Sequence, residues 1–329
     1  MNRRAFLTAA CAAALLPAGA FADDITLQLD AAAAYARPRR GVSLVVMHRG
    51  RIIFEDYPNG GGADTGWELA SGTKSFTGVI AAALVKDGRL ALDEPAAETL
   101  PEWRADARKR RITIHQLLSL ESGIAAAGGI GRPPPYAEAL NAAAEYDPGV
   151  HFEYGPAPFQ IFGEIVRRKT GGDPVDYLTR RLFDPLDIAP TEWRRGGDGN
   201  SFMPQGAHFT ARAWARFGEW VRGGGADLVD PQALAQCFVP SHANPGYGMS
   251  WWLLRPGLIP PGRMAGVEVD AGITERFGVI RMAAGLGDQR LYIVPELDLV
   301  IARQARIFGM RLGAQWTDAE FLRALLGGQ

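Results

Sequence analysis

Ser71 and Lys74 stand three residues apart, directly before an apolar pattern of helical period, and this spacing could support nucleophilic chemistry. The pattern predicts a helix that begins near Ser71 and stops at Gly88, which places the two side chains one turn apart on the same side. The positive end of a helix disfavours a nearby ammonium, and burial lowers the pKa of a lysine further. A lysine held in this way can take the proton of a neighbouring serine, which then attacks a carbonyl carbon.

The same spacing is also typical of a serine that caps a helix and of a lysine that lies in solvent. Serine is among the residues preferred at helix N-caps, and a charged side chain in the first turn of an exposed helix is common. The Ser71 to Lys74 spacing alone leaves both interpretations open. Other parts of the chain must decide between them.

The elements that would position these residues divide the chain into ends rich in strands and a helical middle. Helices are predicted at residues 23–40, 112–120, 157–170, 174–183, 210–223 and 312–326. Strands are predicted at residues 42–47, 51–56, 247–254, 275–284, 289–294 and 297–303. Strands from both ends can share one sheet, so we expect an α/β (α+β) fold. It has an antiparallel sheet built from both chain ends, flanked by helices, with an all-helical insertion.

The first 22 residues have the pattern of an export signal. Arg3 and Arg4 precede a short apolar run, and a small-residue cleavage pattern ends at Ala22. The run is shorter than a bilayer span, so we expect cleavage after Ala22 and no stable membrane insertion afterwards. The paired arginines suit a twin-arginine or an ordinary secretory route, and the protein is expected to be periplasmic or secreted.

We therefore expect residues 1–22 to be a signal peptide and residues 23–329 to form one domain. Within that domain, residues 23–75 and 245–329 would build the sheet subdomain. Residues 76–244 would build the mainly helical subdomain.

Composition argues against several classes of partner and cofactor. The formal net charge is −1, which gives no support for a nucleic-acid-binding surface. Cys237 is the only cysteine after the signal, so it predicts packing rather than a disulfide. The five histidines form no metal-binding pair, and phosphate and dinucleotide motifs are absent, so neither a metal nor a cofactor is expected.

Several further stretches occur in an order typical of one superfamily. Tyr154 follows a Pro148-Gly149 turn, and Gly285-Leu286-Gly287-Asp288 precedes a pair of terminal strands. With Ser71-Gly72-Thr73-Lys74, these stretches resemble the serine beta-lactamase and D-Ala-D-Ala carboxypeptidase superfamily. Within it, the chain is most similar to class C beta-lactamases and to their esterase and amide-hydrolase relatives. Matching stretches at 112–123, 183–186 and 294–300 extend the resemblance over almost all of the chain after the signal.

The resemblance implies roles for three side chains. Ser71 would be the acylated nucleophile and Lys74 its proton partner. Tyr154 would be the second general acid/base group, with a pKa lowered by two nearby cations. No cofactor enters this scheme.

The resemblance also implies residues that would hold the substrate. The oxyanion hole would use the Ser71 N–H and an N–H near Asp288. Gly285 and Gly287 would form the strand edge along the substrate. Tyr136, at the end of the Gly- and Pro-rich loop 123–136, and the segment 242–252 would lie beside the substrate.

Two departures from the superfamily pattern bear on the substrate. Gly155-Pro156 follow Tyr154 where an Asn is usual two residues on, and Gly285-Leu286-Gly287 stand where a Lys or His is usual. Arg276, Arg281 or Arg290 could supply a replacement cation. An uncharged motif fits a small ester or amide better than a beta-lactam. A beta-lactamase or D-Ala-D-Ala peptidase, and a catalytically silent penicillin- or peptide-binding protein, remain the alternatives.

Overall fold

The computed structural model describes residues 26–128, 132–262, 266–308 and 315–327. Its main element is a six-stranded sheet in the order β2-β1-β9-β8-β7-β6, in which every neighbouring pair is antiparallel. The strands are β1 (Gly41–His48), β2 (Arg51–Asp56), β6 (Trp252–Leu254), β7 (Ile280–Gly285), β8 (Gln289–Val294) and β9 (Leu299–Ala305). Both ends of the chain contribute strands, which confirms the predicted fold class.

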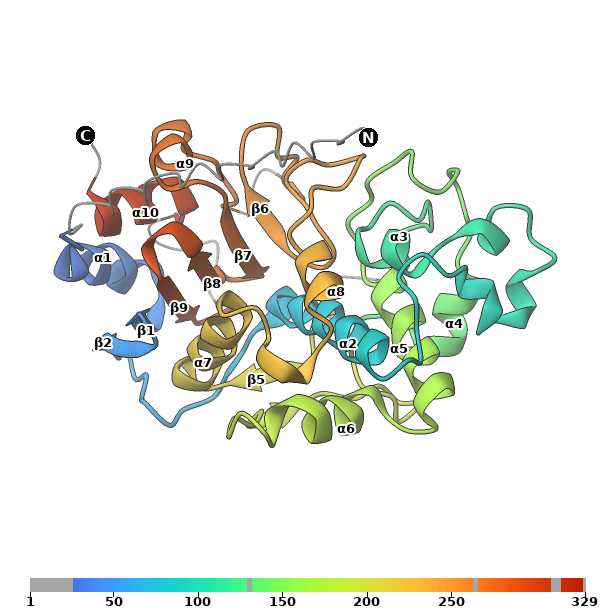
Figure 1. Cartoon of the computed structure of the whole chain (residues 1–329). Helices are drawn as coiled ribbons and strands as arrows, with labels where there is room; N and C mark the ends of the chain where they lie inside the picture. The colour runs from blue at the N-terminus through green and yellow to red at the C-terminus, as the bar shows by residue number, and fades with distance from the viewer. Residues whose placement is uncertain (1–25, 129–131, 263–265, 309–314, 328–329) are drawn as a thin grey trace, which may run out of the picture.

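Helices cover both faces of this sheet (Figure 1). On one face α1 (Leu29–Ala36) packs beside α10 (Asp318–Leu326), and the Gln28 N–H donates to the Leu325 carbonyl at 2.8 Å. On the other face lies α7 (Ala211–Arg222), where Gly218 allows close contact with Leu291 and Val300. Because both faces are covered, β8 and β9 are buried along their whole length.

The helical block lies to one side of the sheet, with α2 between the two halves (Figure 1). It contains α2 (Ser75–Lys86), α3 (Ile114–Leu118), α4 (Tyr136–Asn141), α5 (Ala157–Thr170), α6 (Pro174–Leu178) and α8 (Pro231–Gln236). A small second sheet joins β3 (Trp67–Glu68), β5 (Ala207–Phe209) and β4 (Glu192–Trp193). Thr113 caps α3 in a capping box with Gln116.

The structure differs from the sequence prediction in two places near the C-terminal strands. Residues 275–284 are not one strand, because α9 (Ala271–Phe277) comes first and the Asp270 side chain caps it. Residues 247–254 form a strand only from Trp252, because the preceding residues make a tight turn in which Ser250 has φ +71°. In both places a local turn or cap overrides the apolar pattern.

Two further boundaries differ from expectation. The helix predicted over residues 23–40 is shorter, with α1 followed by a 3-10 turn at Arg37–Arg39. The helix predicted over 174–183 is α6 followed by a π-helical turn at Thr179–Phe183.

The domain division inferred from the sequence stays a prediction. Residues 1–22 lie outside the described residues, so the export signal is also untested. In the part of the chain that the structure describes, no helix is both long and apolar enough to cross a membrane. Helix α7 belongs to the predicted helical segment 76–244, yet it packs on the main sheet.

Candidate active site

Ser71 lies in a 3-10 turn, Ala70–Lys74, that leads directly into α2. The turn is fixed to β5 by two hydrogen bonds: the Leu69 N–H donates to the Ala207 carbonyl at 2.9 Å, and the Ala207 N–H donates to Thr73 Oγ1 at 3.2 Å. Ala70 adopts φ +46°, a strained conformation that non-glycine residues rarely take. The sequence placed Ser71 at a helix entrance, and the structure refines this to a tight turn with a strained first residue.

The Lys74 amine is directed at the Ser71 hydroxyl. Lys74 Nζ lies 2.9 Å from Ser71 Oγ and donates a second hydrogen bond to the Pro204 carbonyl at 3.1 Å. The side chain is only 4% exposed, and its surroundings are aromatic: the ring centres of Tyr154 and Phe159 lie 4.9 and 5.4 Å from Nζ.

This environment favours the neutral amine. Among the described residues Lys74 forms no ion pair, and burial lowers its pKa to about 7. A substantial share of the Lys74 amine is therefore neutral at physiological pH and can accept the Ser71 proton.

Tyr154 stands beside the same hydroxyl from the helical side, two residues before Pro156, which caps α5. Burial raises the pKa of the phenol, while the nearby Ser71 hydroxyl and Trp252 indole act to lower it. The Arg290 charge acts in the same direction, but burial is the larger effect and the pKa of Tyr154 is raised overall. The expectation that cations would lower this pKa is therefore wrong, and the phenol keeps its proton at neutral pH.

Trp252 is a site residue that the sequence did not single out within the segment 242–252. Its ring centre lies 5.4 Å from that of Tyr154 and 4.8 Å from that of Tyr247. It belongs to β6 and pairs with Met282 of β7, so the sheet fixes its position. Phe152 completes the cluster at 5.4 Å from Tyr247. The Trp251-Trp252 pair before a terminal strand was the available signal.

The end of β7 touches the nucleophile turn. A β carbon on Gly285 would lie 2.0 Å from the Leu69 carbonyl oxygen and 3.1 Å from the Gly72 nitrogen, so only glycine fits. Gly287, with φ +74°, follows in the turn to β8 and lies against the backbone of Ile307. The structure thus brings Gly285 to the Ser71 turn and places Gly287 two residues beyond it.

Asp288 points away from Ser71. Its carboxylate accepts a hydrogen bond from Arg40 Nη2 at 2.6 Å, and its carbonyl accepts one from Arg303 Nη1 at 2.5 Å. The strand edge that faces the nucleophile turn is at Gly285, three residues earlier. The N–H that the sequence located near Asp288 is therefore better sought at the Gly285–Leu286 end of β7.

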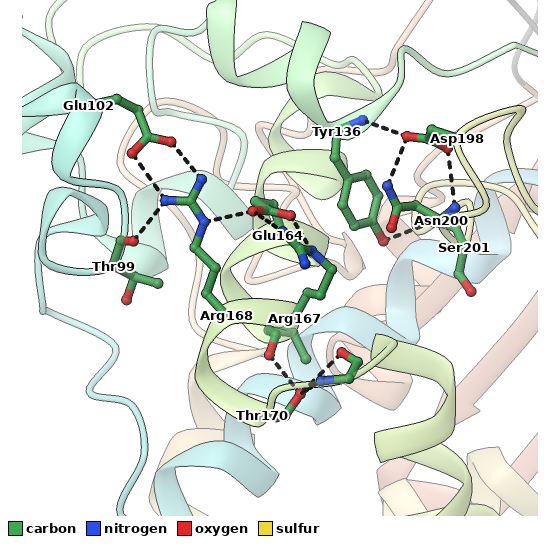
Figure 2. Close-up of polar contacts among 12 residues, drawn as sticks. Thr99, Glu102, Tyr136, Glu164, Arg167, Arg168, Thr170, Asp198, Asn200 and Ser201 are labelled. Carbon is green, nitrogen blue, oxygen red and sulfur yellow. Dashed lines mark hydrogen bonds and ion pairs between the residues drawn. The ribbon is translucent and has the colours of Figure 1, made fainter.

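Tyr136 is not brought to the Ser71 turn. It lies inside the helical block, where its hydroxyl donates to the Ser201 carbonyl at 2.9 Å and its N–H donates to Asp198 at 3.3 Å (Figure 2). The ring packs against Gly163 of α5, and the side chain is 2% exposed. An aromatic residue at the end of a Gly/Pro loop looked like a lining residue, but helix packing buries it.

The departure at Gly155-Pro156 lies in a tightly packed part of the chain. A β carbon on Gly155 would lie 2.7 Å from that of Ala126, so the chain after Tyr154 is packed tightly on the 123–128 loop. Pro156, where an Asn amide is usual in the superfamily, begins α5 instead.

The three candidate replacement cations already have partners. Arg290 is buried and donates to Asp318 at 2.7 Å and to the Gly285 carbonyl at 3.2 Å. Arg276 and Arg281 lie over the rings of Phe277 and Phe238. Within the described ranges, no cluster of three or more His, Cys, Asp or Glu side chains has the geometry of a metal site.

Comparison with protein families and curated proteins gives a consistent assignment. The family model described as Beta-lactamase matches residues 22–305. Protein flp of Staphylococcus aureus is 25% identical over 174 residues, covering 47% of this chain and 35% of flp. Lovastatin esterase of Penicillium rubens is 28% identical over 155 residues, covering 38% of this chain and 39% of the esterase. The chain thus spans little more than a third of the length of these curated relatives.

Solved structures share the fold over nearly the whole chain. A penicillin-binding protein homologue from Caulobacter crescentus has a TM-score of 0.66 and 18% identity, covering 93% of this chain and 97% of its own. A beta-lactamase from Mycobacterium bovis has a TM-score of 0.65 and 20% identity, covering 90% and 98%. At these identities the similarity establishes the fold and leaves the substrate open.

Proposed function

This chain belongs to the beta-lactamase family, and from that premise we propose that it is a serine hydrolase acting on small, uncharged esters or amides through an acyl-enzyme on Ser71. One observation carries the proposal: the buried Lys74 amine lies 2.9 Å from the Ser71 hydroxyl, with Tyr154 beside the same oxygen. A capping serine and a solvated lysine would not give this arrangement.

The reaction would proceed in two halves. Ser71 Oγ attacks the carbonyl carbon of the substrate while its proton passes to the Lys74 amine. The bond to the leaving group then breaks, and the leaving oxygen or nitrogen takes a proton from Tyr154 or Lys74. Water attacks the acyl carbon while its proton passes to whichever of Tyr154 and Lys74 protonated the leaving group. The bond between the acyl carbon and Ser71 Oγ then breaks as Oγ takes a proton from Lys74, which releases the acid and restores the Ser71 hydroxyl.

The substrate preference follows from the charges near Ser71. The side chains of Gly285-Leu286-Gly287 offer neither a cation nor a hydroxyl. The Arg290 guanidinium behind them is already bound to the Gly285 carbonyl and to Asp318, and Arg281 lies over the Phe238 ring. Binding a carboxylate next to the reacting carbonyl needs a cation at hydrogen-bond distance. A neutral acyl group with a neutral leaving group therefore fits this site better than a beta-lactam or a peptide ending in a carboxylate. The similarity to a lovastatin esterase supports the ester assignment.

The test is a substrate panel with the purified protein lacking residues 1–22. We expect p-nitrophenyl acetate and butyrate to be turned over, and nitrocefin to be a poor substrate by comparison. Rapid nitrocefin turnover with little esterase activity would instead assign a beta-lactamase or D-Ala-D-Ala peptidase. A penicillin adduct that forms but never hydrolyses would indicate a silent binding protein.

We also propose that the enzyme acts outside the cytoplasm, because Arg3-Arg4 and the apolar run that follows have the pattern of an export signal. Edman sequencing of the exported protein should start at Asp23. A retained Met1 would contradict this.

A further inference from the structure

The turn between β7 and β8 is fixed in place by contacts with side chains that do not touch Ser71. The turn consists of Leu286, Gly287 and Asp288, and it directly follows Gly285, which touches the Ser71 turn. Gly287 and Asp288 both have positive φ, +74° and +67°. Asp288 is not a glycine, so this conformation must be stabilised by contacts elsewhere.

Asp288 has such contacts on both of its polar groups. Its carboxylate and Arg40 Nη2 are 2.6 Å apart, and the two side chains are only 14% and 13% exposed. Its carbonyl accepts a hydrogen bond from Arg303, whose side chain is fully buried and lies over the Trp316 ring at 4.1 Å. Asp288 is thus bound to two arginines from the far side of the sheet.

The positive charges of Arg40 and Arg303 are stabilised by the negative charge of Asp288. Burial lowers the pKa of Arg303 to about 9, and the Asp288 charge opposes this lowering. Across the described ranges Arg303 forms no ion pair with a carboxylate, and Arg40 Nη2 lies 2.6 Å from the Asp288 carboxylate. Removal of the Asp288 charge would therefore take away the negative charge that lies beside both poorly solvated cations.

The next residue fixes the turn to β9. Gln289 is fully buried, and its side-chain amide donates to the Ala305 carbonyl at 2.7 Å and accepts from the Ala305 N–H at 3.0 Å. Arg40 also belongs to this attachment, since the Arg306 N–H donates to the Arg40 carbonyl at 3.1 Å. The turn is consequently attached to the rigid sheet on the side opposite Ser71.

We propose that Asp288 is a positioning residue: its ion pair with Arg40 holds the β7–β8 turn so that the Gly285–Leu286 backbone stays in place against the Ser71 turn. This inference rests on the proposed function, because the backbone held in this way is the edge along which the reacting carbonyl would lie. Loss of the pair lets the edge shift, and a shift of about 1 Å at a reacting centre is enough to slow a reaction by up to about a hundredfold. Binding of the substrate's outer parts is unaffected.

The test compares D288N with a matched control, D87N. Asp87 forms a partly buried ion pair with Arg181 at 2.7 Å in the helical block, remote from β7. For D288N we expect kcat for p-nitrophenyl acetate to fall at least about tenfold, with KM changed less than about twofold. For D87N we expect kcat within about twofold of the parent protein, whatever the loss of thermal stability. The rate of Ser71 labelling by a fluorophosphonate should fall in parallel with kcat.

R40M removes the same pair while keeping the Asp288 side chain, and D288E keeps the charge. R40M should reproduce the kcat loss, D288E should restore most of it, and R40M/D288N should be no slower than D288N alone. A folded D288N with unchanged kcat would overturn the proposal, as would equal kcat losses in D288N and D87N. If D288N does not fold, a folded R40M with unchanged kcat overturns it. The S71A variant distinguishes the positioning role of Asp288 from the proposed function. Ester hydrolysis that survives in S71A would contradict the proposed function itself.

Discussion

Gly285 of β7 lies so close to the backbone of Leu69 that no side chain fits between them: a β carbon would be 2.0 Å from the Leu69 carbonyl oxygen. The first prediction follows from this contact. G285A must push β7 away from the Ser71 turn, and we expect kcat/KM to fall by about a hundredfold. The control is G172A, where a β carbon meets nothing within 4 Å and activity should stay within about twofold. Ester hydrolysis at full rate in G285A would show that the contact has no part in the reaction.

The second prediction concerns the pH dependence of acylation. The Lys74 amine must be neutral to accept the Ser71 proton, and burial lowers its pKa to about 7. We therefore expect kcat/KM to rise with pH through a midpoint near 7 and to level off above it. Stopped-flow or plate-reader rates between pH 5 and 9 measure this. A profile that is flat over this range would contradict the role of Lys74.

The third prediction is that Lys74 lowers the stability of the protein. Because its folded-state pKa is lower than its unfolded-state pKa, the unfolded state binds more protons between about pH 7 and 10.5. The loss of stability caused by burying Lys74 is largest below pH 7 and becomes smaller as the pH rises from about 7 to 10.5. K74M should abolish turnover, with a loss of about a thousandfold. It should also raise the free energy of unfolding at pH 7 by about 2–4 kcal/mol.

Thermal or urea unfolding of K74M at pH 7 and at pH 10 measures the stability effect. The gain over the parent protein should be smaller at pH 10, where the unfolded lysine also begins to lose its proton. An identical gain at both pH values would show that charge burial is not its cause.

The fourth prediction concerns Trp252, whose indole interacts with the Tyr154 phenol. W252F keeps an aromatic ring at this position but removes the N–H that acts on the phenol, so we expect kcat to fall by about threefold to tenfold, the size of one polar contact. The neighbouring Trp251 is the matched control, because its buried indole N–H has no hydrogen-bond partner among the residues that the structure describes. W251F should leave kcat within about twofold. Equal losses in both variants would indicate a packing effect instead.

Local sequence patterns predicted the fold well where packing and pattern agree. The strand predicted at 289–294 and the helix predicted at 157–170 occur where their apolar patterns place them, and the strand predicted at 297–303 is β9, displaced by two residues to Leu299–Ala305. Where a cap or a turn competes with the pattern, prediction failed: Asp270 starts a helix inside a predicted strand, and the turn at Ser250 shortens β6.

The site was predictable to the extent that it is local in sequence. Ser71 and Lys74 are three residues apart, so the helical geometry alone places the amine near the hydroxyl. Tyr136 and Asp288 depend on long-range packing, and each finds its partners elsewhere, at Ser201 and Arg40. Trp252 reaches Tyr154 through the pairing of β6 with β7, which no local pattern specifies.

The central claim is that Ser71 becomes acylated, and intact-mass analysis after exposure to a fluorophosphonate tests it most directly. We expect one adduct per chain, located by peptide mapping on the tryptic peptide that contains Ser71, and none on S71A. We also expect S71A to lose ester hydrolysis. An adduct on another residue, or S71A that hydrolyses p-nitrophenyl acetate at the parent rate, would contradict the account.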